Sequence, residues 1–355
     1  MKEQRTVAVT GGAGFLGQHI VKHLHQCPMF TKIRIIDVKD YQQLLDFVPM
    51  KPVEVIKADL RNYEEIQDGL HGVNTVIHTA GLVDVSTFPD ADKLNQINVS
   101  GTQNVIKACL KCNVESLVYT SSVDVVIGFN DIMDGSEALP LPKTLLWGEY
   151  AKTKQQAEQL VCVANDSLLE NGSKLKTAVI RPNVMYGELD PHYVIEGLKS
   201  AKQFFGKVPR IGRGRARFQS SYVGNTAWAH VKAAQTLMDK KSAAGGQAFF
   251  ATDDTPLMDL QEFLRLFLNL RNYDLTYFFI PYLVVFVLFF LFEFFANLIK
   301  SVYKVNSQTL TMKSIRQLNQ TVHFTSRKAE KLIGYKPIYS FKESFRASAE
   351  YYRSL

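Results

Sequence analysis

A glycine-rich turn near the start of the chain constrains the fold more than any other feature. The β-branched run from Thr6 to Thr10 predicts a short buried strand, and apolar residues from Phe15 to Leu24 recur at helical spacing. Between them, Gly11, Gly14 and Gly17 follow a G-x-x-G-x-x-G spacing. These glycines permit a tight turn, a close approach of the backbone to a pyrophosphate, and close helix–strand packing. The unit therefore predicts a dinucleotide site at the N-terminus of the helix.

An acidic residue follows the second predicted strand, at the position that distinguishes two related dinucleotides. This strand runs from Lys32 to Ile36 and ends at Asp37, twenty residues after Gly17. A carboxylate there can hydrogen-bond the adenosine ribose and would repel the 2′-phosphate of NADP. We therefore expect NAD as the cofactor, although Lys39 is close enough to leave some tolerance of NADP open.

The chain then alternates predicted strands and helices. Further strands are expected at residues 53–56, 73–78 and 117–122, and helices at residues 64–70 and 98–110. This alternation predicts right-handed βαβ units and a Rossmann-like, doubly wound parallel α/β sheet that binds ligands beyond the carboxyl ends of its strands. Asp59 follows the third strand, where its carboxylate is placed to meet the adenine edge. Thr79 and Ala80 follow the fourth strand, where small side chains let the backbone lie against the cofactor.

The length and composition of the chain limit its domain number, its binding partners and its metal sites. A chain of 355 residues can hold a large α/β domain with a smaller appended one. The net charge of +7 is compatible with a nucleic-acid or anionic-membrane partner. No basic run with interleaved aromatic residues supports nucleic-acid binding, so we expect none. Cys109 and Cys112 form a lone C-x-x-C in a helical pattern, and without a second pair they predict no metal site.

A tyrosine and a lysine one helical turn apart form the candidate catalytic pair. The helix predicted from Tyr150 to about Ala164 places Tyr150 and Lys154 on one face. A phenol is a poor acid or base at neutral pH, since its reference pKa is about 10. A neighbouring ammonium and an oxidised nicotinamide ring both favour the phenolate, so Tyr150 can take the proton of an alcohol as hydride leaves. A serine at the end of the fifth strand, Ser121 or Ser122, would hold the substrate oxygen.

These stretches resemble a known enzyme family. The motifs are TGGAGFLG, VIHTAGLVDV, NVSGTQNVIKAC, VYTSS, YAKTK, IRPNVMYG, YVGNTAWAH and FFATDDTP. They are similar to those of the extended short-chain dehydrogenase/reductases, and within them of the 3β-hydroxysteroid dehydrogenases. The resemblance implies NAD-dependent oxidation of a steroid or sterol 3β-hydroxyl to the 3-ketone, with Ser122, Tyr150 and Lys154 as the catalytic set. Ser122 matches the family serine, and Ser121 should be uninvolved because adjacent strand residues point to opposite faces.

The resemblance also implies a cofactor site and a division of the chain. The residues expected to contact NAD are Gly11, Gly14, Phe15, Leu16, Gly17, Asp37, Asp59, Leu60, Thr79, Ala80, Tyr150 and Lys154. We expect an NAD-binding domain over residues 1–182, substrate-binding elements over 183–274, a membrane segment over 275–299, and the C-terminal part of a smaller substrate domain over 300–355. Homodimer formation stays open.

The first departure from the family pattern concerns a second activity. In the dual-function steroid enzymes, an acidic tyrosine just before the Asp-Asp of a D-D-T-P motif takes part in shifting a double bond. Phe249 and Phe250 hold that place here, although Asp253 and Asp254 remain. A phenyl ring has no proton to donate, so we expect dehydrogenation with little or no Δ5–Δ4 isomerisation.

The second departure is a long apolar run from Leu275 to Phe292, uncharged between Asp274 and Glu293. Its length is close to the limit for a membrane-spanning helix. We expect it to break at Pro281, to dip into one leaflet or lie in its plane, and to leave near Glu293, because a single crossing would separate the C-terminal tail from the sheet. The resemblance implies an endoplasmic reticulum membrane with the catalytic domain facing the cytosol, or alternatively a mitochondrial membrane.

Two alternatives remain open. A decarboxylating sterol-4-carboxylate 3-dehydrogenase shares the fold and the catalytic residues, and the basic segment at residues 210–217 would suit its carboxylate substrate. The same segment could be a solvated loop or a contact for anionic lipid headgroups. The other alternative is a catalytically silent NAD-binding membrane scaffold, against which the intact set of Ser122, Tyr150 and Lys154 argues.

Overall fold

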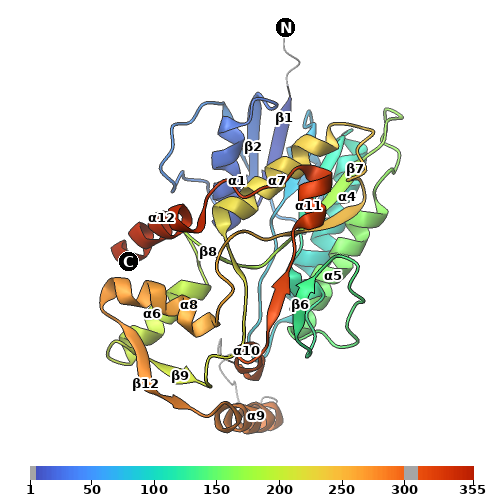
Figure 1. The fold of residues 1–355 in the computed structure, drawn as a ribbon. Helices are drawn as coiled ribbons and strands as arrows, with labels where there is room; N and C mark the ends of the chain where they lie inside the picture. The colour runs from blue at the N-terminus through green and yellow to red at the C-terminus, as the bar shows by residue number, and fades with distance from the viewer. Residues whose placement is uncertain (1–4, 300–310) are drawn as a thin grey trace.

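A seven-stranded parallel sheet is the framework of the molecule (Figure 1). The structure, a computed structural model, describes residues 5–299 and 311–355. The strand order is β11-β7-β5-β4-β1-β2-β3, and it reverses between β1 and β4, the point at which such sheets bind ligands. The strands of this sheet are β1 (Thr6–Thr10), β2 (Lys32–Asp37), β3 (Val53–Lys57), β4 (Thr75–His78), β5 (Ser116–Thr120), β7 (Lys176–Pro182) and β11 (Gln247–Ala251).

Helices cover both faces of the sheet because its strands are apolar on both sides. Along β1, Val7 and Val9 belong to one buried cluster and Ala8 to another, as the alternation of a strand requires. Among the helices that contribute to the first cluster, α1 (Phe15–Gln26) and α7 (Val223–Leu237) pack against the sheet. Those that contribute to the second cluster are α2 (Tyr63–Leu70), α4 (Gly101–Lys111) and α5 (Gly148–Val163).

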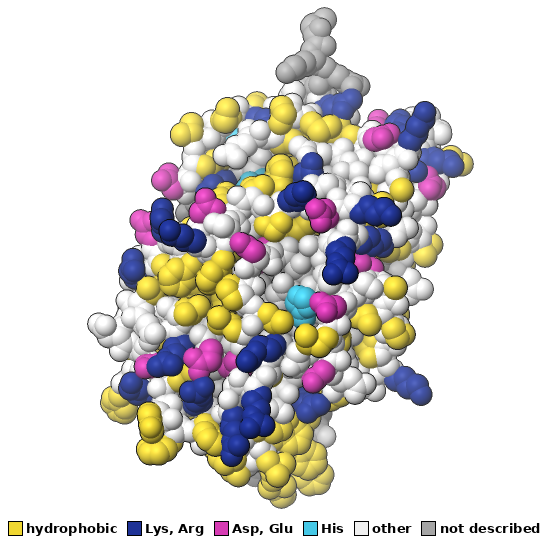
Figure 2. Space-filling model, viewed as in Figure 1, with side chains coloured by type: hydrophobic (Ala, Val, Ile, Leu, Met, Phe, Trp, Pro, Cys, Tyr) yellow, Lys and Arg dark blue, Asp and Glu magenta, His cyan; other side chains and the backbone are white. Residues whose placement is uncertain are grey.

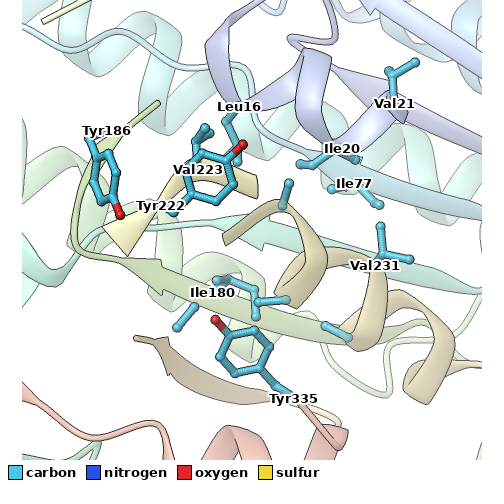
Figure 3. Packing of buried hydrophobic residues seen from close by; sticks show 14 of the residues in the cluster. Leu16, Ile20, Val21, Ile77, Ile180, Tyr186, Tyr222, Val223, Val231 and Tyr335 are labelled. Atoms are coloured by element: carbon cyan, nitrogen blue, oxygen red, sulfur yellow. The ribbon is translucent and has the colours of Figure 1, made fainter. Parts of the chain in front are cut away.

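The first cluster joins the sheet to the C-terminal part of the chain. Figure 3 shows Ile20 of α1, Ile77 of β4 and Val231 of α7 in this cluster, each of them 0% exposed. Tyr335, more than a hundred residues after α7 begins, lies in the same cluster near Ile180 of β7 (Figure 3). Burying a large apolar side chain of this kind stabilises a fold by roughly 1.5–3 kcal/mol.

The remaining strands lie outside the main sheet. Three two-stranded sheets pair β8 (Val184–Tyr186) with β10 (Ser220–Tyr222), β9 (Lys207–Ile211) with β12 (Asp274–Ile280), and β6 (Ile132–Gly135) with β13 (Val322–Phe324). The other helices are α3 (Ala91–Leu94), α6 (Tyr193–Gln203), α8 (Leu260–Leu268), α9 (Tyr282–Ile299), α10 (Met312–Gln317), α11 (Arg327–Ile333) and α12 (Phe341–Ser354). A π-helical turn (Asn95–Ser100) and 3₁₀ turns (Val123–Val125 and Asn269–Arg271) complete them. In Figure 1, α9 forms the lower edge of the molecule.

The predicted Rossmann-like parallel α/β fold is confirmed, with small shifts in element ends. The fourth strand begins at Thr75, because the amide of Val73 instead donates to the Leu70 carbonyl in the turn after α2. The fifth strand ends at Thr120, so Ser121 and Ser122 follow the strand rather than close it.

The long apolar run forms two elements. Its first part is β12, which pairs with β9, and α9 begins directly after Pro281, where the sequence predicted a break. α9 continues past Glu293 to Ile299. Within residues 5–299 and 311–355, no helix has the length and apolar character needed to cross a membrane. Residues 300–310, at the start of the expected C-terminal segment, lie outside the described residues.

A buried histidine joins α1 to α7. His23 is 2% exposed, and its Nε2 lies 3.0 Å from the carbonyl oxygen of Gly224. Its ring packs near Trp228 and Tyr339. Burial lowers the pKa of His23 to about 4, and the neighbouring His19 acts in the same direction. The folded protein therefore leaves His23 neutral at pH values where the unfolded chain binds a proton there.

We expect the free energy of unfolding to fall as the pH decreases from 6.5, the ordinary histidine value, to about 4. In His23→Gln, the amide can still donate to Gly224, but one titrating group is gone. Between pH 6.5 and about 4, the free energy of unfolding should therefore decrease less in this variant than in the wild type. The difference between the two decreases should be at most about 3 kcal/mol. Urea unfolding at a series of pH values measures the difference, with exposed His192→Gln as the control. Identical slopes for His23→Gln and the wild type would contradict this account.

Candidate active site

A close contact between the glycine-rich turn and α1 shapes the space beyond β1. Gly11 has φ +72°, and a Cβ on it would lie 2.7 Å from the backbone of Ala80. A Cβ on Gly17 would collide with the carbonyl oxygen of Gly11. Thr79 closes the same corner, since its hydroxyl donates to the Thr10 carbonyl at 2.8 Å. The turn, Thr79 and Ala80 therefore meet at the switch point of the sheet.

The N-terminus of α1 is free to receive an anion. Gly14 is the N-cap, and no side chain caps the first turn, which begins with Phe15 and Leu16. The first N–H groups of this 12-residue helix, together with its dipole, attract negative charge. The glycines keep clear the volume that Cβ atoms would fill. These residues therefore fit the pyrophosphate of a dinucleotide.

Asp37 stands at the end of β2 beside the turn. Its Oδ2 accepts a hydrogen bond from the Ala13 amide at 3.0 Å, and its Oδ1 accepts one from the Lys39 amide at 3.0 Å. Both bonds fix the carboxylate beside the glycine-rich turn. Each oxygen retains a lone pair, so the group can still accept hydrogen bonds from sugar hydroxyls.

Asp59 and Leu60 lie further along the same edge, after β3. The Asp59 carboxylate pairs with Arg61 at 2.6 Å, and this hydrogen-bonded pair lowers the pKa of Asp59. Leu60 is buried, and its carbonyl oxygen accepts a hydrogen bond from Asn104 at 2.8 Å. The adenine contact expected of Asp59 therefore stays a prediction. The structure shows in addition that Arg61 is paired with this carboxylate.

Tyr150 and Lys154 lie one turn apart on α5, and both are buried. The Lys154 ammonium donates to the Thr120 carbonyl oxygen at 2.5 Å. Burial lowers the pKa of Lys154 to about 7. Burial also raises the pKa of Tyr150, and the nearby Asp124 carboxylate raises it further. The protein alone thus holds Tyr150 as a neutral phenol, and an added positive charge is needed to favour the phenolate.

Asn98 supports this helix from the π-helical turn. Its Oδ1 accepts a hydrogen bond from the Leu82 amide at 2.7 Å, and its Nδ2 donates to the Leu82 carbonyl at 3.0 Å. Nδ2 also donates to the Thr153 hydroxyl at 3.1 Å. Asn98 therefore fixes backbone around the site, and π-turns often occur at functional sites.

The two serines after β5 have different partners. The Ser121 hydroxyl donates to Glu158 at 2.6 Å, and Glu158 in turn accepts from Arg181 at 3.0 Å. The Ser122 hydroxyl donates to Asp124 at 2.8 Å, and Ser122 lies near enough to Tyr150 to lower the pKa of its phenol. The structure therefore brings Ser122 to Tyr150 and directs Ser121 into a separate ion-pair network.

Asp124 is the site residue that sequence reasoning missed. Besides accepting from the Ser122 hydroxyl, it donates its own amide to Ser122 Oγ at 3.1 Å. Burial raises the pKa of Asp124 to about 6, against the lowering effect of the Ser122 hydrogen bond. The only signal in the sequence is a single acidic residue in the apolar stretch V-D-V-V that follows the serines.

His78 is held as a structural residue. Its Nδ1 lies 2.6 Å from the Thr10 hydroxyl and its Nε2 lies 3.1 Å from the Thr102 hydroxyl. It is fully buried, and this burial lowers its pKa to about 3. Across residues 5–299 and 311–355, no group of His, Cys, Asp or Glu side chains could hold a metal ion.

Two buried phenylalanines occupy the place where the dual-function enzymes have an acidic tyrosine. Phe249 and Phe250 are both 0% exposed, and Phe250 stacks on Phe324 with ring centres 4.3 Å apart. Asp253 accepts hydrogen bonds from the Tyr222 amide at 2.8 Å and from Asn225 at 3.0 Å. Asp253 thus ties β11 to the start of α7.

Comparison with known proteins assigns the chain to a protein family. Residues 8–280 match the 3-beta hydroxysteroid dehydrogenase/isomerase family. The chain belongs to this family. The predicted family and the predicted enzyme class, a dehydrogenase, are thereby confirmed.

Individual relatives agree with this assignment. The mouse protein named 3 beta-hydroxysteroid dehydrogenase type 7 is 33% identical over 348 residues, which cover 95% of this chain and 92% of that protein. The monkeypox virus 3 beta-hydroxysteroid dehydrogenase/Delta 5→4-isomerase is 39% identical over 254 residues, 70% of this chain and 72% of the viral one. The Thermus thermophilus UDP-glucose 4-epimerase, solved in complex with NAD, shares the fold at a TM-score of 0.67 and 19% identity, covering 98% of this chain and 99% of its own.

The two serines offer a matched pair of substitutions. We expect Ser122→Ala to reduce kcat strongly, because it removes the hydroxyl that faces Tyr150. We expect Ser121→Ala to keep kcat within about threefold of the wild type and to lower stability by about 1–3 kcal/mol, because it leaves the buried Glu158 oxygen without that donor. Steady-state kinetics and thermal unfolding of both variants measure this. A larger loss of kcat in Ser121→Ala than in Ser122→Ala would reverse the assignment.

Proposed function

We propose that this member of the family oxidises the 3β-hydroxyl of a steroid or sterol to the 3-ketone, with NAD as the hydride acceptor. The observation that carries the proposal is the convergence of Ser122, Tyr150 and Lys154 beyond β5. β5 is separated from β1 only by β4, so this group lies on the same sheet edge as the uncapped N-terminus of α1. A silent scaffold would have no need of this arrangement.

Each side chain has a role that follows from its position. Ser122 orients the substrate oxygen, and Tyr150 takes the hydroxyl proton as the C–H bond breaks. Lys154, one helical turn from Tyr150 and held by the Thr120 carbonyl, carries a positive charge when it is protonated, and such a charge favours the phenolate. Asp37 and the free N–H groups of α1 hold the ribose and the pyrophosphate. NAD, when bound, supplies the hydride acceptor and a positive ring that further favours the phenolate.

The proposed reaction stops largely at the ketone. Phe249 and Phe250 carry no acidic proton, and both rings are fully buried. Asp253 is occupied by the Tyr222 amide and by Asn225. The groups present at the D-D-T-P motif therefore support packing, and migration of the double bond should be slow.

Oxidation of a Δ5-3β-hydroxysteroid by the purified chain tests the proposal. We expect turnover with NAD exceeding that with NADP, and accumulation of the 3-keto-Δ5 steroid before slow conversion. Tyr150→Phe should lower kcat by about 10²–10⁴-fold with little change in NAD affinity, while Tyr351→Phe serves as the control. Substantial activity in Tyr150→Phe would refute the catalytic assignment, and rapid formation of the conjugated enone would refute the isomerase part. A 4-carboxysterol in the same assay tests the decarboxylating alternative.

We also propose that the protein contacts a membrane, in the endoplasmic reticulum with the catalytic part facing the cytosol, through β12 and α9. Tyr277 and Phe278 of β12 are 91% and 81% exposed. The exposed apolar residues of α9 are Leu283, Val284, Val287, Leu288, Phe290, Leu291, Phe292, Phe294, Phe295 and Leu298. A contiguous apolar surface of this extent is typical of a membrane or partner contact. Figure 2 shows hydrophobic side chains gathered at the lower edge of the molecule, where Figure 1 places α9.

Basic residues border this surface, which favours a lipid partner. Figure 2 shows Lys and Arg side chains directly above the hydrophobic lower edge. The Arg213 guanidinium lies 5.5 Å from the centre of the Phe279 ring on β12, so the basic segment and the apolar surface adjoin. Arg210 is paired with Glu262 at 2.5 Å. Cations beside inserted aromatic rings suit anionic headgroups, and this placement favours lipid over a substrate carboxylate.

The segments before and after α9 both contact the rest of the protein, since β12 pairs with β9 and the segment after α9 packs near Gly128. Glu293 of α9 accepts a hydrogen bond from the Met312 amide at 2.6 Å, and Gln320 donates to the Gly128 carbonyl at 3.0 Å. A cavity of about 470 Å³ lies between α9 and the loop at residues 87–89, and Glu149, the neighbour of Tyr150, lines it. An α9 that lies in the plane of one leaflet is compatible with both facts and would open this cavity near the lipid.

Vesicle binding and protease protection test the membrane contact. We expect the protein to float with anionic vesicles, and Tyr277→Ser/Phe278→Ser/Leu283→Ser to float several-fold less while keeping its thermal unfolding temperature. In sealed microsomes, tags on both termini should be cleaved by added protease. A protected C-terminal tag beside a cleaved N-terminal one would mean a true span and would refute the in-plane arrangement.

A further inference from the structure

The ammonium of Lys154 lies over an aromatic ring to which the proposed reaction gives no role. Its Nζ is 4.4 Å from the centre of the Tyr119 ring, which belongs to β5. A cation within about 6 Å of a ring is attracted by the negative face of the π-system, and this attraction is stronger where both groups are removed from water. Tyr119 and Lys154 are both buried. The contact is therefore of the kind that stabilises a buried positive charge.

Lys154 needs such stabilisation, because burial lowers its pKa to about 7 and its charge is easily lost near neutral pH. One of its N–H groups donates to the Thr120 carbonyl oxygen at 2.5 Å. A Cβ on Gly81 would lie 3.8 Å from Nζ, so the ammonium adjoins the segment that follows β4. The Tyr119 ring covers another side of the ammonium, and the remaining N–H groups stay available to molecules bound at this edge of the sheet.

The other titratable groups near Lys154 give its charge little support. Among the described residues whose charge shifts the pKa of Lys154, Glu158 of α5 is the one that favours the ammonium. Glu158 is itself paired with Arg181 at 2.5 Å. His78 of β4 and His230 of α7 also lie near Lys154, but burial lowers their pKa values to about 3 and about 4, so both rings are neutral at pH 7. The ring face of Tyr119 therefore matters for this lysine.

The hydroxyl of Tyr119 does not account for a tyrosine at this position. Within the part of the chain that the structure describes, the hydroxyl makes no hydrogen bond. The nearby Thr102 hydroxyl donates instead to the Asn98 carbonyl oxygen at 2.6 Å. Burial raises the pKa of Tyr119 well above its ordinary value, and the nearby Tyr150 acts in the same direction, so Tyr119 stays a neutral phenol. A buried hydroxyl without a partner is unfavourable, so the contribution of this side chain comes from its ring.

We infer that Tyr119 is a positioning residue for the proposed reaction, and that its ring face holds the Lys154 ammonium in the charged form that favours the Tyr150 phenolate. The inference rests on the proposed function, because it takes Tyr150 as the base and the protonated lysine as its support. Tyr119 itself exchanges no proton. Without the ring, Lys154 loses its proton at a lower pH, and fewer molecules carry the ammonium and the phenolate together.

The test removes the ring in the full chain and follows oxidation of a Δ5-3β-hydroxysteroid at saturating NAD across a range of pH. In Tyr119→Leu we expect the pKa of Lys154 to fall from about 7 to about 6. Above the pH at which Lys154 loses its proton, kcat should be about tenfold lower than in the wild type, with KM for the steroid within about twofold. Well below that pH, kcat should match the wild type. Tyr119→Phe keeps the ring face and should match the wild type throughout.

The matched control is Phe249→Leu on β11. Phe249 is also a buried strand residue, and the Lys328 Nζ lies 5.2 Å from its ring centre, but neither residue belongs to the catalytic group. This variant should lose stability as Tyr119→Leu does, without a change in the pH profile. A loss of kcat that is uniform across pH in Tyr119→Leu would show that Tyr119 acts only through packing. An equal loss in Tyr119→Phe would show that the hydroxyl, not the ring, matters. Either result would overturn the inference.

A series of fluorinated rings keeps the test decisive if Tyr119→Leu does not fold. Phenylalanines that carry one, two and three ring fluorines at position 119 nearly keep the shape of the ring while weakening its negative face stepwise. Above the pH at which Lys154 loses its proton, kcat should fall stepwise along this series. A constant kcat across the series would refute a cation–π role for Tyr119.

A readout without turnover separates this inference from the proposed function. NMR titration of the Lys154 side chain in lysine-labelled protein should give a lower pKa in Tyr119→Leu than in the wild type, and the wild-type value in Tyr119→Phe. If this holds but the wild type oxidises no steroid, the proposed function is refuted and the contact between ring and ammonium stands. An active wild type whose Lys154 pKa is the same in all three proteins refutes the inference and leaves the function standing.

Discussion

The contact of α1 with the turn after β1 is the constraint on which the rest of the structure depends. Because no Cβ fits at Gly11 or Gly17, helix and turn approach more closely than side chains would allow. α1 then presents an uncapped N-terminus at the switch point of the sheet, while its far face buries Ile20 and His23 against α7. The anion site and the first core cluster are thus two consequences of one packing contact. A side chain at Gly17 would disturb both together.

Burial controls the chemistry on the other side of the site. Burial lowers the pKa of Lys154 to about 7 and raises the pKa of Asp124 to about 6. Both shifts favour the uncharged form, because a charge is costly in an apolar surrounding. A partly buried acid and a buried base with pKa values this close to neutrality can both exchange protons under physiological conditions. Glu158 and Arg181 lie nearby but satisfy one another as an ion pair. Pairing makes that couple structural, and the lack of such pairing leaves the neighbouring groups available for chemistry.

The parts of the molecule that the sequence predicted are those whose determinants are local. The glycine spacing, the apolar strands and the helical spacing of Tyr150 and Lys154 each act within a few residues, so the sheet and the catalytic pair could be inferred. The Ser121–Glu158 bond joins segments 37 positions apart, and only the fold shows it. Asp124 escaped notice because its significance depends on burial. The apolar run at Leu275 is compatible with strand or helix by composition, and pairing with β9 decides for a strand.

The buried ring of Phe250 packs against the segment that returns after α9. Phe250 stacks on Phe324 of β13, and the Arg181 guanidinium lies 5.3 Å from the Phe250 ring centre. β13 pairs with β6, just beyond the loop whose carbonyl at Gly128 accepts from Gln320. The returning segment is therefore anchored beside the Ser122–Asp124 turn by an apolar stack. A tyrosine at this position would bring a hydroxyl that needs a hydrogen-bond partner into that stack, so phenylalanine favours anchoring of the segment over a second catalytic acid.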